Sequence, residues 1–401
     1  MAQKEASRRR RTTVKKAIHT GKRKGRVLET LLEGLARFQF RFGILIVIAA
    51  LVMSVFMGIG IRDIEMESDF NAMMPQHLPI FQLNEKITDT FSGQDTVFIL
   101  FKLDEDVEMK GAPTDILDPL ILQYIQLLDS SLKHENAIDS VLSLAPAIDA
   151  AERAYPELTT EAVLQILDSQ PQLKTLISDD RKKMIVMLKA DVGSGDEGII
   201  ALEELVQNKL DALSGPPGTD VMITGSPSVR VVILDLLRHD AIYTLIIAFI
   251  IIFLLLIVME RSLRESIIIS IPLLLGILWT GGTLAWLDIK ISFATAGLGA
   301  MLLGLGVEYG VFMLKRFREE RAKRGSDEEA FLEAVPKVGS AILGSGTTTI
   351  VGFLALTLSI LPMMQNLGFS LALGIFYSII VAVVIEPVII RFDQYVRGRQ
   401  R

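Results

Sequence analysis

The sequence predicts an α+β membrane protein, and two observations carry this prediction. Half of the 401 residues are hydrophobic, and they gather into six blocks instead of being spread evenly along the chain. Each block has about the 20 residues that a helix needs to cross a bilayer. A long polar segment separates the first block from the second, and its pattern alternates strands with helices. The six blocks are 42–61, 241–259, 267–287, 291–314, 341–361 and 367–390.

The blocks divide the chain into five parts. These are a basic tail (1–41), a first transmembrane helix (42–61), an exported domain (62–238), a bundle of five transmembrane helices (239–390) and a second basic tail (391–401). We interpret the first block as an uncleaved anchor, because its apolar run is longer than the core of a signal peptide. Mixed charges and apolar residues over about 315–337 predict an amphipathic helix along the inner membrane surface.

The distribution of charge predicts the orientation of the chain in the membrane. Residues 62–238 contain 31 acidic and 14 basic residues, whereas the remainder contains 16 acidic and 27 basic ones. Basic residues cluster at both ends and beside the short loops, so the positive-inside rule places both termini in the cytoplasm and the acidic domain outside. We interpret the basic amino-terminal tail as an orientation signal and expect no nucleic-acid partner.

The exported domain has the pattern of a split βαβ fold of the ferredoxin-like type. Strand-like runs alternate with amphipathic helical stretches in the order strand, helix, strand, then strand, helix, strand. Residues 145–177 form an extra helical insertion, with Thr159 at a helix start. Two further helices are expected, over 79–91 and from Ser226 into the second span. The predicted strands are 96–103, 137–144, 184–188 and 221–224, and the predicted helices are 118–132 and 198–213.

Metal and enzyme chemistry have little support in this sequence. Cysteine is absent, which excludes disulfides and thiolate metal sites. The four histidines, His19, His77, His134 and His239, have no spacing that would converge on a metal ion. We therefore expect no catalytic residues, no metal and no cofactor, and a protein that is not an enzyme.

A carboxyl inside the fourth apolar block is the most informative feature of the chain. Glu308 lies seven residues before Lys315, where the apolar helix reaches water, so its depth is about 10 Å. The side chain is too short to reach the surface from there, and it must be protonated, partnered or facing a wet cavity. An acidic residue in that place indicates a transport pathway. A second acid, Glu386, precedes Arg391 by five residues, so we expect it at the cytoplasmic interface, within reach of water or that arginine.

Small residues recur every four positions near Glu308 and on the following helix. The first ridge contains Ala296, Ala300, Gly304 and Glu308, and the second contains Ser340, Gly344, Thr348 and Gly352. Such ridges let two helices approach closely. The hydroxyls of Thr347, Thr348 and Thr349 would then be available to bond the carboxyl or its proton. Packing alone could also account for the glycines.

In the runs 304–320, 346–353 and 366–387, the chain resembles the resistance-nodulation-division (RND) superfamily, and especially its mycobacterial-membrane-protein-large (MMPL) and hopanoid-exporter branch. The resemblance covers nearly the whole chain and implies a six-helix RND-type bundle with one porter-like domain. In this branch the unit usually occurs twice. The likeness therefore implies a homodimer or a pair with a related half-transporter.

The resemblance also implies roles for individual residues. The acidic residue of the fourth span and the tyrosine after it exchange protons in the family, and these positions are Glu308 and Tyr309 here. Gly304, Thr347, Thr348 and Thr349 would support them. The family more often has aspartate at the first position, and often another in the sixth span, where this chain has Ser378.

The resemblance implies a proton-driven exporter of lipids or other hydrophobic molecules in the cell (plasma or inner) membrane, with membrane lipid or a hydrophobic substrate as its ligand. One alternative is an accessory of protein export like the SecD/SecF proteins, which also have six spans and a large first outer loop. Another is a non-transporting, lipid-binding scaffold in which Glu308 is structural. The residues leave open the substrate, the choice between proton and sodium, and the identity of the partner.

Overall fold

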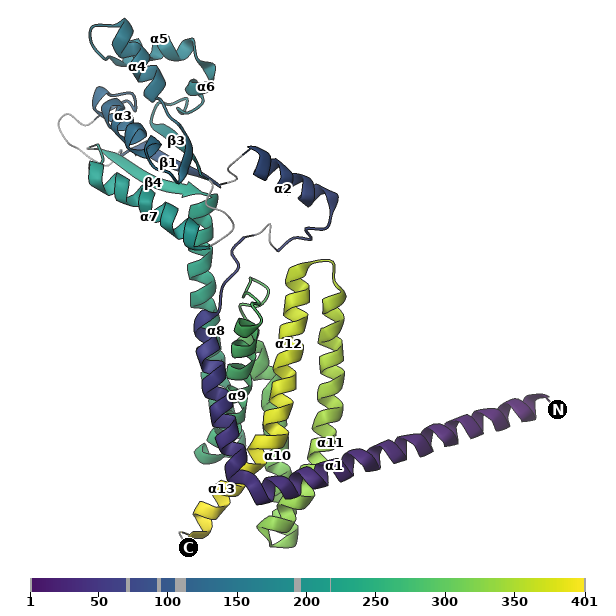
Figure 1. The fold of residues 1–401 in the computed structure, drawn as a ribbon. Helices are drawn as coiled ribbons and strands as arrows, with labels where there is room; N and C mark the ends of the chain where they lie inside the picture. Colours follow the sequence, from purple (N-terminus) through teal and green to yellow (C-terminus); the bar gives the residue numbers. More distant parts are fainter. Residues whose placement is uncertain are drawn as a thin grey trace. The chain divides into compact units, whose positions relative to one another are not determined.

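The structure, a computed structural model, describes residues 2–69, 73–91, 95–104, 113–190, 196–216 and 218–399. It divides into two compact units. One unit combines Met1–Glu67 with Leu237–Arg401 and contains the membrane-length helices, and the other is Ser68–Leu236. Figure 1 labels the elements of both.

The Ser68–Leu236 unit is built on a four-stranded antiparallel sheet. Its strands are β1 (Asp95–Leu103), β2 (Ile138–Leu142), β3 (Lys183–Ala190) and β4 (Thr219–Gly225), in the order β2-β3-β1-β4. Helix α3 (Pro119–Lys133) joins β1 to β2, and α7 (Asp196–Leu213) joins β3 to β4. Alternate residues of β1, such as Val97, Ile99 and Phe101, are buried in one core with residues of both helices. The ferredoxin-like class of this domain stays a prediction.

Three short helices form the predicted insertion between β2 and β3. They are α4 (Ala145–Ala154), α5 (Thr160–Asp168) and α6 (Pro171–Lys174). The Thr159 hydroxyl caps α5, because it accepts a hydrogen bond from the Ala162 amide, which would otherwise have no partner within the helix. Ile148 and Val163 join the main core, so the insertion packs as part of the domain. Before the sheet, α2 (Pro79–Phe91) exposes the apolar side chains Ile80, Leu83 and Ile87.

One carboxyl on α7 makes the stability of this domain pH-dependent. Glu203 is half-buried, its Oε2 has no hydrogen-bond partner among the described residues, and burial raises its pKa. Because the folded state then holds this proton more tightly than the unfolded state, stability falls as the pH rises through the pKa of the folded state. We expect Glu203→Gln to slow hydrogen exchange of α7 amides relative to the wild type at neutral pH. The difference should vanish at a pH below the carboxyl's ordinary pKa, and an equal difference at both pH values would contradict this account.

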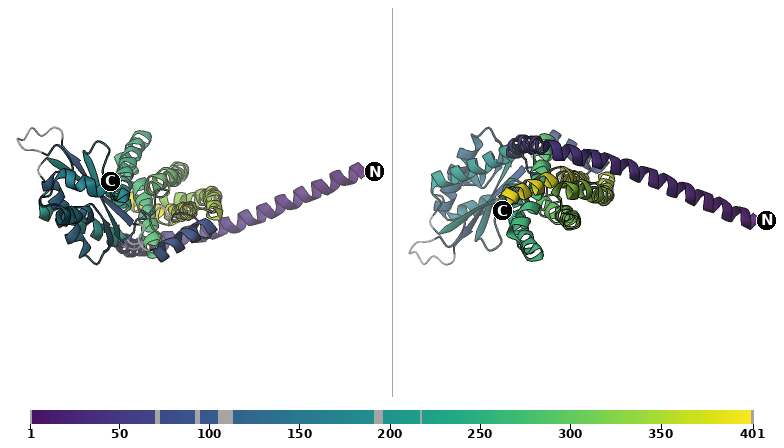
Figure 2. Two further views of the ribbon diagram at one scale, coloured as in Figure 1. Left: turned by 90° about the horizontal axis from the view of Figure 1, so that it is seen from above. Right: turned by 90° about the horizontal axis from the view of Figure 1, so that it is seen from below.

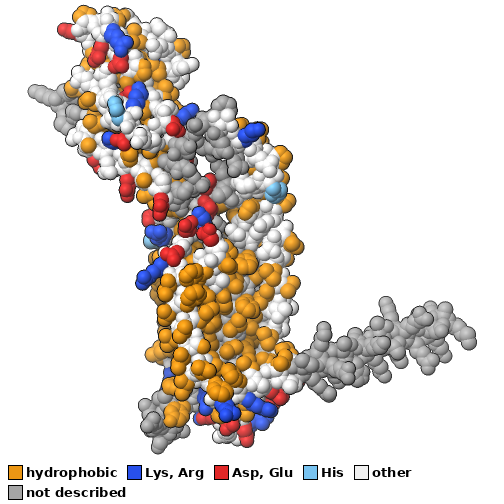
Figure 3. Space-filling model, in the orientation of Figure 1, with side chains coloured by type: hydrophobic (Ala, Val, Ile, Leu, Met, Phe, Trp, Pro, Cys, Tyr) orange, Lys and Arg blue, Asp and Glu red, His pale blue; other side chains and the backbone are white. Residues whose placement is uncertain are grey.

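The other unit contains six helices that are long and apolar enough to cross a membrane. Figure 2 shows the helices of this unit nearly end-on, and Figure 3 shows hydrophobic side chains gathered along their outer surface. The helices are α1 (Ala2–Gly60), α8 (Ser226–Glu260), α9 (Leu263–Trp286), α10 (Leu298–Arg324), α11 (Asp327–Leu354) and α12 (Pro362–Ile380). Short 3-10 turns, η1 (Ile61–Asp63) and η2 (Ala355–Leu358), follow α1 and α11, and a π-helical turn, η3 (Val381–Ile385), connects α12 to α13 (Glu386–Arg399).

Helix α1 bends at Phe42, the residue at which the first apolar block begins. Its backbone angles there are φ −115° and ψ 26°, which lie outside the helical region. Before the bend, Leu32 is buried against Gly339 of α11, and the ring of Phe40 meets that of Phe331 edge-on at 5.9 Å. Part of the predicted basic tail therefore belongs to the bundle, because its apolar side chains cover α11.

Glycines allow several pairs of helices to touch at their backbones. A Cβ atom added at Gly282 of α9 would lie 2.4 Å from the carbonyl oxygen of Met57 in α1. One added at Gly368 of α12 would lie 2.5 Å from the carbonyl oxygen of Phe353 in α11. Close packing through small residues is the main source of attraction between helices in lipid, where the hydrophobic effect is absent.

Two predicted boundaries are wrong. The fourth span was predicted to start at residue 291, but Ile291 forms a parallel bridge with Met66, and α10 begins seven residues later. No separate amphipathic helix forms over 315–337, because Gly325 ends α10 with φ at +71° and Ser326 caps the start of α11. The charged residues of this segment extend α10 and α11 beyond the apolar region instead.

Ion pairs tie the end of α8 to the end of α10. Glu260, whose side chain is 3% exposed, lies 3.0 Å from Arg318 and 3.5 Å from Lys315. Arg318 also pairs with Glu265 at the start of α9. Near the middle of α8, Leu245 packs over Gly299, where an added Cβ would lie 2.9 Å from Leu245 Cδ1. The first contact is ionic and directional, whereas the second is apolar.

Candidate functional site

Glu308 lies on a face of α10 that the rest of the chain leaves uncovered. Its side chain is exposed and has no hydrogen-bond or ion-pair partner among the described residues. Met301, Gly304 and Phe312 are exposed on the same face, and a Cβ added at Gly304 would meet nothing within 4 Å. A carboxyl of the membrane-length part of α10 thus points away from the single chain, between two large apolar side chains.

The neighbouring helix α11 also exposes small residues. Gly344, Thr348 and Gly352 of the predicted second ridge are exposed, and an added Cβ would meet nothing at either glycine. The predicted first ridge is shorter than expected, because Ala296 lies before the first residue of α10. We call this surface, made of Gly304, Glu308, Gly344, Thr348 and Gly352, the small-residue face.

The threonines of α11 do not bond Glu308 within one chain. Thr347 donates to the Leu343 carbonyl at 2.6 Å, Thr348 to the Ser345 carbonyl at 2.6 Å, and Thr349 to the same carbonyl at 3.2 Å. Hydroxyls in apolar helices commonly bond the preceding turn of their own helix in this way. Their oxygens retain the ability to accept a bond, so the expected role in holding the proton stays a prediction.

Tyr309 points into the bundle and not toward the small-residue face. It is 2% exposed, and its phenol is hydrogen-bonded to the side chain of Thr349 on α11. Gly346 lies beside the phenol, where an added Cβ would be 3.5 Å from the Tyr309 hydroxyl, and its missing side chain leaves room for Ile379 of α12. Tyr309 therefore links the helix that carries Glu308 to α11 from the inside.

Ser378 lies on the opposite side of α10 from Glu308. Its hydroxyl donates to the Gly374 carbonyl at 2.9 Å and lies 3.1 Å from a Cβ added at Gly306. Gly306 is two residues from Glu308, which is about 200° around the helix. The structure does not bring Ser378 to Glu308, and its visible role is to pack α12 against α10 and Gly276 of α9.

The expected environment of Glu386 is wrong. It is 0% exposed, and neither oxygen has a hydrogen-bond partner among the described residues. Arg391 is engaged elsewhere, because it donates to the Phe40 carbonyl and stacks over the ring of Phe40 at 3.7 Å. The sequence carried a signal for this burial, since Glu386 stands within the apolar run 379–390. The prediction of an interfacial position used the short sequence distance between Glu386 and Arg391, but the two side chains contact different parts of the protein.

Six membrane-length helices, with a large domain inserted after the first of them and a carboxyl within the fourth, define a multi-pass membrane protein. The chain belongs to the MMPL family, a family of membrane transporters. The profile of that family matches residues 119–392, which include strands β2, β3 and β4 and the last five membrane-length helices.

Two relatives illustrate the range of the family. The chain is 31% identical over 370 residues to the membrane protein MJ1562 of Methanocaldococcus jannaschii, an alignment that covers 92% of this chain and 95% of the relative. It is 28% identical over 220 residues to the siderophore exporter MmpL5 of Mycobacterium tuberculosis, with 53% of this chain and 23% of MmpL5 covered.

Among solved structures, the hedgehog release protein Disp of the water bear Hypsibius dujardini has a similar fold. The TM-score is 0.57 at 14% identity, and the match covers 91% of this chain and 48% of Disp. The chain thus spans about half the length of this structural neighbour, and a smaller share of MmpL5.

Proposed function

We propose that the protein is a proton-driven exporter of lipids or other hydrophobic molecules, and that it works as a dimer of six-helix halves. The observation that carries this proposal is the exposure of Glu308 on the small-residue face. A charged carboxylate facing lipid at the centre of a helix costs about 3 kcal/mol or more. A second six-helix unit against this face would remove the carboxyl from lipid and enclose it between helices that approach closely.

The chemistry of the face favours a second copy of this chain as the cover. An isologous interface places the same surface of both partners together, so two small-residue faces would meet with the exposed Met301 and Phe312 at their borders. Two Glu308 carboxyls would then share one site. Like charges in one site cannot both ionise easily, and this favours proton uptake by one of them.

The comparisons support export as the direction of transport. MmpL5 is a siderophore exporter and Disp is a hedgehog release protein, and both names describe outward movement of a molecule. We assign to this chain the cell membrane, cytoplasmic termini and an outward path for its substrate. Inward proton flow releases about 2.3 kcal/mol per charge at 100 mV.

The proposed mechanism couples the charge of Glu308 to helix movement. Protonation of Glu308 removes a charge from the interface between two α10 helices, and release of the proton restores that charge. The protonated and the ionised state therefore favour different packing of the two helices. Tyr309 and Thr349 would transmit a shift of α10 to α11. Helix α8 runs without a break from Ser226 to Glu260 and provides a continuous connection to the end of β4.

Single-cysteine cross-linking tests the dimer directly, because the natural chain contains no cysteine. We expect Gly304→Cys and Thr348→Cys to form disulfide-linked dimers in native membranes under mild oxidation. The matched control is Val258→Cys on α8, which is 72% exposed but far from the small-residue face in sequence and on another helix. Efficient cross-linking of Val258→Cys together with none at Gly304→Cys would overturn the proposed interface.

Native mass spectrometry in native-lipid particles tests the substrate class. A mass of two chains with a retained lipid or other hydrophobic molecule is expected. A single chain accompanied by protein-translocation subunits would instead favour an accessory role in protein export.

A further inference from the structure

The buried carboxyl at the start of α13 is a second titratable group in the bundle. Glu386 is 0% exposed and both of its oxygens lack a hydrogen-bond partner among the described residues. Burying an ionised carboxylate without a partner costs several kcal/mol, whereas a protonated carboxyl in the same place costs far less. The conformation seen here therefore requires a proton on Glu386.

The carboxyl lies against the same helix that carries Glu308. A Cβ added at Gly310 of α10 would lie 3.2 Å from each oxygen of Glu386 and 3.1 Å from Ile269 Cγ2 of α9. Gly310 thus provides the space for the carboxyl beside the backbone of α10. Ionisation of Glu386 would destabilise its contact with α10, because the charge would lie beside apolar groups of α9 and α10.

The backbone next to Glu386 is irregular and leaves a further acceptor without a partner. The π-helical turn Val381–Ile385 immediately precedes Glu386. Gln39 of α1 donates from Nε2 to the carbonyls of Val383 at 2.7 Å and Val384 at 3.2 Å, while its Oε1 is buried without a partner among the described residues. Unpartnered buried acceptors are places where water or a proton is held, and single π-turns are frequent at functional sites.

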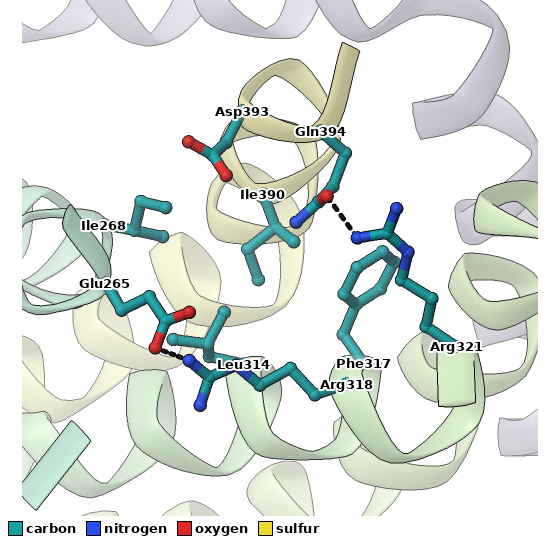
Figure 4. A pocket seen from close by; sticks show the side chains of 9 residues that line it. All are labelled: Glu265, Ile268, Leu314, Phe317, Arg318, Arg321, Ile390, Asp393 and Gln394. Atoms are coloured by element: carbon teal, nitrogen blue, oxygen red, sulfur yellow. Dashed lines mark hydrogen bonds and ion pairs between the residues drawn. The ribbon is translucent and has the colours of Figure 1, made fainter. Parts of the chain in front are cut away.

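A polar cavity is lined by residues of α9, α10 and α13 that lie close to this carboxyl in the sequence. Its volume is about 120 Å³, which is room for several water molecules. Ile390 lies one helical turn after Glu386, and Leu314 lies one turn after Gly310, so the cavity stops about one turn from the carboxyl. Figure 4 shows Ile390 and Leu314 among the charged side chains of its wall. The lining residues are Glu265, Ile268, Leu314, Phe317, Arg318, Arg321, Ile390, Asp393 and Gln394.

None of the charged side chains that the structure describes around Glu386 neutralises it. The helices packed against α13 are α1, α9, α10 and α11. The charged groups of these helices near this level have other partners. Arg318 pairs with Glu265, and Lys315 pairs with Glu260 of α8. Lys337 pairs with Glu333, and Arg41 lies over the ring of Phe42. On α13 itself, Arg391 bonds the Phe40 carbonyl and Asp393 pairs with Arg264, and Tyr309 beside Gly310 is hydrogen-bonded to Thr349. Water in the cavity is thus the available acceptor for the proton.

We propose that Glu386 is a second proton-exchange site. When the side chains of Leu314 and Ile390 move apart, Glu386 releases its proton to water in this cavity or takes a proton back, and when they close again the exchange stops. The O–H bond of the carboxyl breaks, the proton passes to a water molecule and then to the solution at that end of the bundle, and a carboxylate remains. The role of this exchange in transport depends on the proposed proton coupling through Glu308, but the exchange itself does not. Glu308 would serve the interface between halves, and Glu386 the end of the bundle where α9, α10 and α13 meet.

Infrared difference spectroscopy of the full chain in lipid tests this proposal. One C=O stretch of a protonated carboxyl should be present in the wild type, absent in Glu386→Gln and retained in Glu308→Gln, whereas any band of a protonated Glu308 would be lost only in Glu308→Gln. The Glu386 band should shift in deuterium oxide and disappear reversibly as the pH is raised. A Glu386 band that neither exchanges nor titrates would show a permanently protonated structural group and would overturn the proposal, as would the lack of any band assigned to Glu386.

A cavity-filling variant tests the route. Ile390→Phe should slow deuterium exchange of the Glu386 band by about tenfold, which corresponds to about 1.4 kcal/mol in the barrier. Ile390→Val, which leaves the cavity open, is the matched control and should exchange at least as fast as the wild type. Equal exchange in both variants would rule out this cavity as the path. Loss of proton flux in Glu308→Gln with an intact Glu386 band would separate the two sites, so failure of one proposal is distinguishable from failure of the other.

Discussion

Glu308→Gln is expected to abolish proton-coupled transport while leaving folding and membrane insertion unchanged. Glutamine keeps the size and hydrogen bonding of the side chain but cannot alternate between a neutral and a charged state. The cycle then loses the roughly 2.3 kcal/mol that one proton provides at 100 mV, equivalent to a factor of about 50 in a two-state bias. The measurement is proton flux into proteoliposomes, followed with an entrapped pH-sensitive dye.

The matched control for this prediction is Glu319→Gln on the same helix. Glu319 is 56% exposed and pairs with Arg316 at the charged end of α10. An exposed pair of this kind contributes at most about 1 kcal/mol, so flux and stability should stay near wild-type values. Full proton flux in Glu308→Gln would remove Glu308 from the mechanism, and equal losses in both variants would point to a general effect of charge on α10.

Gly282→Ala is expected to have the largest effect on stability. The added Cβ would lie 2.4 Å from the Met57 carbonyl oxygen and 2.7 Å from its Cα, and backbone atoms cannot move aside as the end of a side chain can. Helices α1 and α9 would have to separate, at a cost of about 3 kcal/mol or more. Thermal unfolding in detergent, followed through the fluorescence of Trp279 and Trp286, measures this loss.

Gly58→Ala is the matched control on α1. A Cβ added there meets nothing within 4 Å, so the unfolding temperature should change little or rise slightly, because alanine favours a helix more than glycine does. A Gly282→Ala protein as stable as Gly58→Ala would mean that α1 and α9 are not in backbone contact.

The membrane-length helices and the succession of strands and helices along the chain follow from local patterns. Blocks of about 20 apolar residues and the alternation of strands with helices required no knowledge of distant contacts, and each of the six blocks overlaps one of the six membrane-length helices. Boundaries set by contacts between distant residues could not be read in this way. The pairing of Ile291 with Met66, which delays the start of α10, joins positions more than 200 residues apart in the sequence.

The candidate site was predictable in type but not in orientation. The sequence identified Glu308 from its depth, and the structure determines which face of α10 it occupies. The sequence could not tell that Tyr309 points inward, that Ser378 lies behind α10, or that the hydroxyls of Thr347 and Thr348 bond their own helix. These facts depend on how three helices are rotated about their axes, and periodic small residues on several faces leave that rotation open.

The ion pairs at the last turn of α8 connect this helix to any movement of α10. Glu260 holds its last turn to Lys315 and Arg318 of α10, so a displacement of α10 must carry that turn with it. The Leu245 contact with Gly299 is apolar and contains no ion pair. A change of packing around a single carboxyl of α10 would in this way reach the helix that directly follows β4 in the chain.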